Sequence, residues 1–75
     1  MKMYNYTVVF EPVDEGGFNV IVPSIPEICT FGETLEEAKE MVADAIRVYI
    51  ESALKAKEPI PEDKEPSIGR VAIRI

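Results

Sequence analysis

The feature that most constrains this chain is the stretch Thr34–Lys57, in which apolar residues recur at steps of three and four. That spacing places them on one face of an α-helix. Thr34 can accept a hydrogen bond from the third helical amide while Glu37 reaches back to the amide of Thr34, which is a capping box. The stretch therefore predicts one long amphipathic helix, whose core face comprises Leu35, Ala38, Met41, Val42, Ala45, Ile46, Tyr49, Ile50, Ala53 and Leu54.

The chain on either side of this helix alternates apolar and polar residues with the period of a β-strand. Strands are predicted at about Met3–Glu11, Phe18–Val22, Ile28–Phe31 and, after the helix, Arg70–Ile75. Gly16 and Gly17 can take positive φ, so the first two strands form a hairpin, and the proline-rich Glu58–Pro66 is an extended connection. The order βββαβ predicts one α+β domain over residues 1–75, an antiparallel sheet with one long helix on one face.

One helix covers only one face of such a sheet. If Tyr6, Val8, Phe10, Phe18, Val20 and Val22 face the helix, then Thr7, Val9, Asn19 and Ile21 look outward. The apolar Val9 and Ile21 have two possible interpretations. They are either ordinary exposed apolar side chains, which are common singly, or part of a contact surface, which a pair on adjacent strands can form.

A domain of 75 residues buries only about 60% of its unfolded surface, so its core is marginal alone. Self-association is a common remedy in small domains. We therefore expect a homo-oligomer, most simply a dimer, in which the C-terminal strand pairs across chains. The interface residues expected are Val9, Ile21, Val71, Ile73 and Ile75.

The residue types present argue against catalysis and metal binding. The chain has no histidine and a single cysteine, Cys29, which excludes an intramolecular disulfide and a Cys/His zinc site. Cys29 lies in a short apolar stretch without a neighbouring base, so we expect it to be a small buried hydrophobe. The acids fall in turns and on the solvent side of the helix rather than converging on a metal pair. No catalytic residue, metal site or cofactor is predicted, which leaves a non-catalytic binding module.

Charge and hydropathy indicate which partners the chain can bind and in which compartment it is expected. Fourteen acids against eight bases give a net charge of −6, which repels nucleic-acid phosphates and suits a basic protein partner or solubility alone. No apolar run approaches the about 18 residues of a membrane span, and the first residues lack an apolar signal core. We expect a soluble, cytoplasmic protein that binds neither nucleic acid directly nor a membrane.

Several motifs along the whole chain resemble the HicB-like antitoxin family. They are Tyr6–Phe10, Asp14–Phe18, Val22–Pro26, Thr30–Ala38, Ala45-Ile46 and Pro59-Ile60-Pro61. The resemblance implies a degenerate, partial RNase H-like fold and an antitoxin that binds and silences HicA, a small ribonuclease that cleaves messenger RNA. Where the family usually reads Pro-Gly-Cys, this chain has Pro26-Glu27-Ile28, with Cys29 one place late. Many relatives carry a C-terminal DNA-binding domain, and none is expected here.

This resemblance leaves two other functions open. One is a stand-alone oligomeric module with an unknown partner and no toxin, and the other is a metal-dependent nuclease on the same fold. If the partner is a basic ribonuclease, we expect acidic and loop residues to cover its RNA-binding surface, because turns on a rigid sheet carry such contacts. The partner-binding residues expected are Asp14 and Glu15 in the first turn and Ser24, Ile25 and Glu27 in the proline loop.

Overall fold

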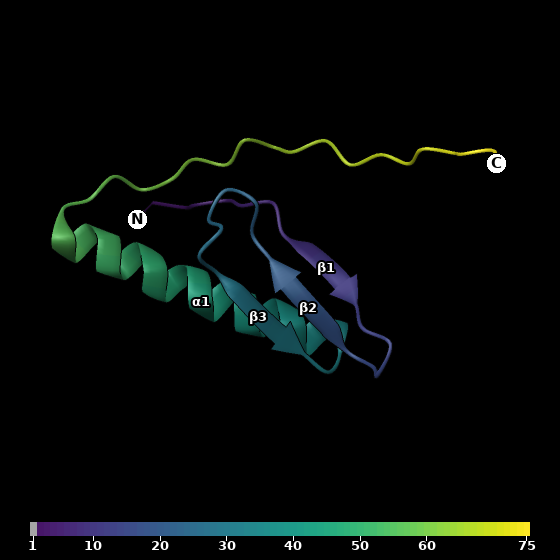
Figure 1. Cartoon of the computed structure of the whole chain (residues 1–75). Helices are drawn as coiled ribbons and strands as arrows, with labels where there is room; N and C mark the ends of the chain where they lie inside the picture. Colours follow the sequence, from purple (N-terminus) through teal and green to yellow (C-terminus); the bar gives the residue numbers. More distant parts are fainter. Residues whose placement is uncertain (1) are drawn as a thin grey trace.

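A computed structural model describes residues 2–75 as a three-stranded antiparallel sheet packed against one long helix (Figure 1). The elements are β1 (Val9–Pro12), β2 (Phe18–Ile21), β3 (Cys29–Gly32) and α1 (Leu35–Ala56). The strands lie in the order β1-β2-β3, so β2 is central and β1 and β3 are edge strands. The α+β class and the three-strand-then-helix order predicted from the sequence are confirmed.

The first strand is shorter than predicted and begins at Val9 rather than at Met3. Val9 pairs with Ile21 at the end of β2, so a residue two places earlier would have to pair with Pro23. Proline has no N–H to donate to a strand ladder. The chain also turns at this point, because the Ile25 amide donates to the Val22 carbonyl at 2.8 Å. Residues 2–8 consequently run beside α1 without joining the sheet (Figure 1).

The ends of α1 are capped much as the sequence predicts. The Glu37 amide donates to Thr34 Oγ1 at 3.0 Å, as expected of an N-cap threonine. Glu37 Oε1 accepts from the amide of Glu33 at 3.0 Å, one residue earlier than predicted. At the other end Lys57 adopts a left-handed conformation, and the Glu58 amide donates to the Ala53 carbonyl at 2.9 Å.

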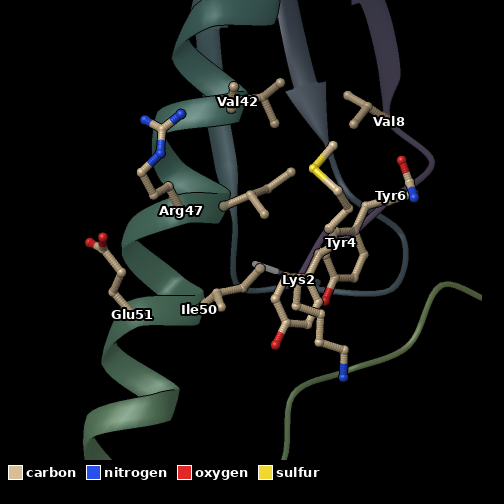
Figure 2. Close-up of a pocket in the computed structure, with 12 residues that line it drawn as sticks. Lys2, Tyr4, Tyr6, Val8, Val42, Arg47, Ile50 and Glu51 are labelled. Atoms are coloured by element: carbon tan, nitrogen blue, oxygen red, sulfur yellow. The ribbon is translucent and has the colours of Figure 1, made fainter.

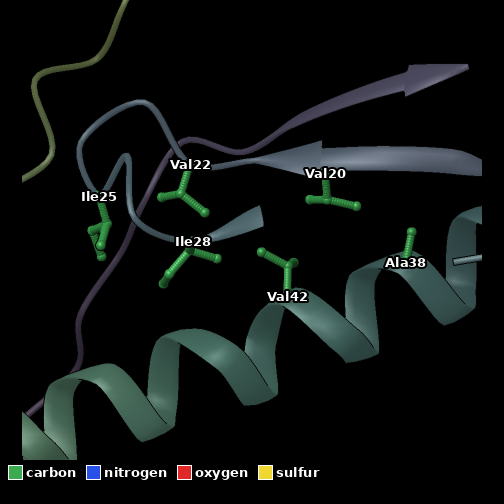
Figure 3. Close-up of a cluster of buried hydrophobic side chains, with 6 residues drawn as sticks. All are labelled: Val20, Val22, Ile25, Ile28, Ala38 and Val42. Carbon is green, nitrogen blue, oxygen red and sulfur yellow. The ribbon is translucent and has the colours of Figure 1, made fainter. Parts of the chain in front are cut away.

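The core lies between α1 and the inner face of the sheet (Figure 3). Its buried cluster comprises Val20, Val22, Ile25, Ile28, Ala38 and Val42, with Tyr6, Val8, Phe10, Phe18, Ala45, Ile46 and Tyr49 partly buried against it. The predicted inward-facing set of the hairpin is thereby confirmed. The prediction is wrong for Leu35, Met41 and Leu54, which are exposed. A 22-residue helix is about 33 Å long whereas four-residue strands span about 13 Å, so the sheet cannot cover the whole apolar stripe.

The predicted fourth strand does not form within the single chain. Residues 58–75 carry no strand, and Arg70–Ile75 is exposed throughout. Glu58–Pro66 is the extended connection that its prolines predict, and the chain beyond it runs away from the sheet (Figure 1). A strand exists only where its backbone pairs with another, and Arg70–Ile75 has no neighbouring strand in the part of the chain that the structure describes.

Replacing Gly32 with alanine should destabilise the domain, because a Cβ at this position would overlap the backbone of Ala38 where β3 meets α1. We expect a loss of about 1–3 kcal/mol in the free energy of unfolding, the usual cost of overpacking. Gly69→Ala is the matched control, since a Cβ there meets nothing within 4 Å. The measurement is urea denaturation, and equal midpoints for the two variants would contradict this account of the interface between β3 and α1.

Candidate functional site

The face of the sheet turned away from α1 carries two rows of side chains. In the first row Val9 lies opposite Ile21, and Ile21 lies opposite Cys29. In the second row Glu11 lies opposite Asn19, and Asn19 lies opposite Phe31. Alternate residues of a strand point to opposite faces, so these six side chains share one surface. We call this set, Val9, Glu11, Asn19, Ile21, Cys29 and Phe31, the outer face.

The outer face carries several apolar side chains that are partly or fully exposed. Val9 and Ile21 are half-buried, Cys29 is exposed, and Phe31 exposes 44% of its surface. Directly opposed side chains on neighbouring strands lie about 5 Å apart, so Val9, Ile21 and Cys29 form a continuous row. The predicted outward placement of Val9 and Ile21 is confirmed. The prediction that Cys29 is buried is wrong, because its register with Ile21 places it on the outer face.

One end of the outer face is acidic. Asp14 and Glu15 are exposed in the turn between β1 and β2, which we call the acidic turn, and Glu11 lies on the adjoining row. Two glycines shape this turn, with φ of 104° at Gly16 and 86° at Gly17. Positive φ is strained for other residues, so the glycines permit this tight turn, which the hydrogen bond from the Gly16 amide to the Val13 carbonyl closes at 2.9 Å.

The other end of the outer face carries the proline loop between β2 and β3, in which the predicted contact residues have different roles. Ile25 is fully buried in the core, so its assignment as a partner-binding residue is wrong. Ser24 Oγ donates to Asp63 Oδ1 at 3.2 Å and accepts from the Lys64 amide at 3.1 Å. Glu27 is exposed and accepts from the Tyr49 hydroxyl at 3.0 Å, a hydrogen bond that raises the pKa of Tyr49.

The acidic turn and the proline loop lie at opposite ends of β2 (Figure 1). They do not form one cluster, although the sequence-based hypothesis used them together. The outer face lies between them, so a partner that rests on this face contacts both ends if it is large enough.

A carboxylate that the sequence analysis did not single out holds the connection after α1 onto the N-terminal segment. Asp63 Oδ1 accepts from the Thr7 amide at 3.0 Å, and Asp63 Oδ2 accepts from the Thr7 hydroxyl at 2.8 Å. Nearby, the Tyr6 hydroxyl donates to the Pro61 carbonyl at 2.6 Å, and burial raises the pKa of Tyr6. We call the contacts of Asp63 with Thr7 and Ser24 the latch. Its partners are far apart in sequence, so no local motif predicts it.

The latch shifts the titration of its carboxylate. The hydrogen bond from the Thr7 amide, followed by that from the Thr7 hydroxyl, holds the pKa of Asp63 below its ordinary value. Hydrogen bonds to the charged form of a carboxylate have this effect.

The residues predicted for self-association are divided between two places. Val9 and Ile21 belong to the outer face, whereas Val71, Ile73 and Ile75 lie in the exposed segment after the latch. The structure of the single chain therefore does not bring these five residues together.

Two further properties concern chemistry and membranes. Across residues 2–75, no group of three or more cysteines and acids is placed to hold a metal ion. In the same part of the chain, no helix is both long and apolar enough to cross a lipid bilayer.

Comparison with known proteins links the chain to antitoxins. Residues 6–72 match the family described as HicB-like antitoxin of bacterial toxin–antitoxin systems. The chain is 46% identical over 61 residues to Antitoxin HicB 1 of Photorhabdus laumondii and 39% identical over 56 residues to Antitoxin HicB of Escherichia coli K12. It is 41% identical over 63 residues to a UPF0150 protein of Thermoplasma acidophilum. No solved structure gives a significant match.

The lengths of these relatives differ. The aligned parts cover 81%, 75% and 84% of this chain in the three comparisons. They cover 39% and 41% of the two antitoxins but 91% of the UPF0150 protein. The chain thus spans about two fifths of the two antitoxins and almost all of the UPF0150 protein.

Asp63→Asn should release the connection after α1, because an amide group cannot accept both Thr7 donors as the ionised carboxylate does. The pKa of Asp63 is lowered below 3.8, so the latch favours the folded chain above pH 3.8 and is lost as the pH falls through the lowered value. The Thr7 amide resonance should therefore titrate on acidification in the natural chain. Asp63→Asn should abolish this titration and Glu62→Gln should keep it. A Thr7 resonance that titrates equally in both variants would contradict the latch.

Proposed function

This chain belongs to the HicB-like antitoxins of bacterial toxin–antitoxin systems, and we propose that it binds and inhibits a small messenger-RNA-cleaving ribonuclease of the HicA type. The observation that carries the proposal is the family match over residues 6–72, which includes the whole outer face and the acidic turn. The chain acts by occlusion, as a non-catalytic protein in the cytoplasm, where its target would meet messenger RNA.

The electrostatics of the chain suit such a partner. A ribonuclease surface that holds RNA presents lysines and arginines to phosphates. With a net charge of −6, this chain is steered towards that surface as RNA is. Asp14 and Glu15 are exposed on a hydrogen-bonded turn, so they can pair with the lysines and arginines that otherwise hold RNA.

The apolar part of the contact is supplied by the outer face. Interface centres are enriched in aromatic residues, and Phe31 exposes 44% of its surface there, with Ile21 and Val9 in the adjoining row of the outer face. Burial of Phe31 against the partner would slow dissociation, whereas the acids at the rim act mainly on the association rate.

The area of the outer face is smaller than the area that a stable protein–protein interface buries on each partner. Three strands about 4.8 Å apart and about 13 Å long make a patch of only about 200 Å². A stable complex buries about 800 Å² on each partner, roughly an eighth of the 6408 Å² that this chain exposes. The contact must therefore extend beyond the sheet, to the acidic turn at one end and to Glu27 in the proline loop at the other.

One further candidate function rests on a separate observation. The chain aligns with 91% of a UPF0150 protein whose name specifies no toxin. A stand-alone binding module of the same fold would use the same outer face for another partner. The discriminating observation is whether a small basic protein is encoded beside the gene for this chain and binds to it.

Reversing the charge of the acidic turn, by Asp14→Lys with Glu15→Lys, should slow association with that toxin and weaken the dependence of the rate on salt. Long-range attraction between exposed charges is screened over about 10 Å at 0.1 M salt, so the effect is largest at low salt. Surface plasmon resonance at two salt concentrations measures both quantities.

The matched control for this variant is Glu51→Lys with Glu62→Lys, which changes the net charge equally at exposed acids in the C-terminal half of α1 and in the connection after it. It should slow association less than the turn variant does. Equal slowing by both pairs would show that only net charge matters and would remove the acidic turn from the site.

Phe31→Ala should speed dissociation of the toxin complex, because it removes the most exposed aromatic side chain of the outer face. A loss of about 1–2 kcal/mol, or roughly 5–30-fold in affinity, is expected of a residue near an interface centre. Val48→Ala, on an exposed helix position outside the outer face, is the control and should leave the dissociation rate unchanged. Unchanged dissociation in a folded Phe31→Ala variant would move the contact elsewhere.

A further inference from the structure

The segment Arg70–Ile75, which we call the arm, has the pattern of a strand but no partner strand among residues 2–75 of its own chain. Val71, Ile73 and Ile75 alternate with polar or small residues, and they expose 86%, 79% and 116% of their surface. A row of large apolar side chains left in water at strand spacing is characteristic of a segment that pairs with another chain.

A groove of matching character lies between the N-terminal segment and α1. It has a volume of about 520 Å³, and Figure 2 shows Tyr4 and Val8 on one side facing Val42 and Ile50 on the other. The apolar and aromatic residues that line it are Met3, Tyr4, Tyr6, Val8, Val42, Ala43, Ile46 and Ile50. The charged residues that line it, Lys2, Arg47 and Glu51, have both signs.

The backbone on one side of the groove, residues 2–8, lies outside the sheet and leads into β1. β1 is an edge strand, and residues 2–8, which precede it, belong to no strand. Their backbone amides and carbonyls are therefore outside the sheet ladder, although the Thr7 amide is used by the latch. An added strand can pair with backbone groups that are free in this way while its side chains enter pockets beside them.

The arm of the same chain does not occupy this groove. The latch holds Asp63 at Thr7 and Ser24, and the Lys64 amide adds a further bond to Ser24. From that point the chain leads away from the N-terminal segment and from α1 (Figure 1). The apolar groove and the apolar arm are thus kept apart within one molecule.

The arm and the groove match each other in length and in apolar character. Six arm residues span about 20 Å as a strand and the groove segment 2–8 spans about 23 Å, so the arm fits along it. Arg70 and Arg74 are the only charged residues of the arm, which leaves six bases and 14 acids in the rest of the chain. The acidic excess of the chain attracts the arm at long range, whereas the groove itself is lined by two bases and one acid. The arm therefore docks there through its apolar face, and the alternation lets both arginines turn to solvent.

We propose that the arm of one copy adds as a strand beside residues 2–8 of a second copy and packs Val71, Ile73 and Ile75 into the groove there. The exchange is reciprocal, because each copy carries both an arm and a groove, which is the two-fold arrangement of most dimers. A single six-residue strand buries less than the about 800 Å² per partner of a stable interface. Two exchanged arms double the contact, so a closed dimer is favoured over a one-sided complex.

Two charge substitutions test the arm with the full chain alone. Sedimentation equilibrium should show a dimer, and Ile73→Lys should raise its dissociation constant at least tenfold. Val48→Lys is the matched control, since it places the same charge at another exposed apolar residue, and it should leave the dissociation constant unchanged. Ile73 makes no contribution to the monomer core, so Ile73→Lys should stay folded. A monomer in the natural chain, or a dimer insensitive to Ile73→Lys, would overturn the proposal.

The position of the docked arm is tested by NMR. A copy with Cys29→Ser and Ala72→Cys carries a nitroxide on the arm and is mixed with isotope-labelled chain that lacks the nitroxide. The amide signals of Tyr4, Ala43 and Arg47 should lose intensity, because these residues line the groove of the second copy. Loss confined to Asn19 and Phe31 would place the arm on the outer face and overturn the groove assignment.

Two further outcomes separate this inference from others. If the groove signals broaden only when the nitroxide and the isotope label are in the same molecule, the arm docks within its own chain and the proposed exchange is wrong. Both experiments use this chain without a toxin. Their failure leaves toxin binding by the outer face untouched, and failure of toxin binding leaves the dimer untouched.

Discussion

The structure depends on the packing of α1 against one face of a three-stranded sheet. Val20 at the centre of that face and Val42 on the helix belong to the same buried cluster, together with residues from the proline loop. Gly32 is required at the point where β3 approaches α1 closely, because the backbone of Ala38 leaves no room for a side chain. Burial of this apolar surface is the main favourable term available to so small a domain.

Because one helix covers one face, the same packing leaves two apolar surfaces open. The outer face is open because no helix or strand formed by residues 2–75 covers it, and the groove is open because β1 begins only at Val9. The two surfaces differ in their surroundings. The outer face borders the acidic turn and suits a basic partner, whereas the groove lies beside residues 2–8, whose backbone is outside the sheet, and suits an added strand.

The latch keeps the arm away from the groove of its own chain. Asp63 bonds to Thr7 and Ser24 and so holds the connection after α1 against the N-terminal segment. The residues beyond Asp63 are exposed to solvent. The arm beyond the latch is consequently available to another molecule. The proposed division of labour, with the outer face for a toxin and the arm for a second copy, follows from these separate positions.

The sequence by itself determined the elements whose causes are local. The period of three and four from Thr34 onward gives α1, the glycine pair gives the hairpin, and the alternation in the hairpin correctly places Val9 and Ile21 outward. The motifs also identified the family. Only the tertiary structure decided what depends on register and on distant contacts. It showed that Cys29 is exposed and Ile25 buried, and that the acidic turn and the proline loop lie at opposite ends of β2. It also showed that the arm pairs with no strand among residues 2–75. An alternating pattern indicates that a segment can form a strand, but it does not specify the segment with which that strand will pair.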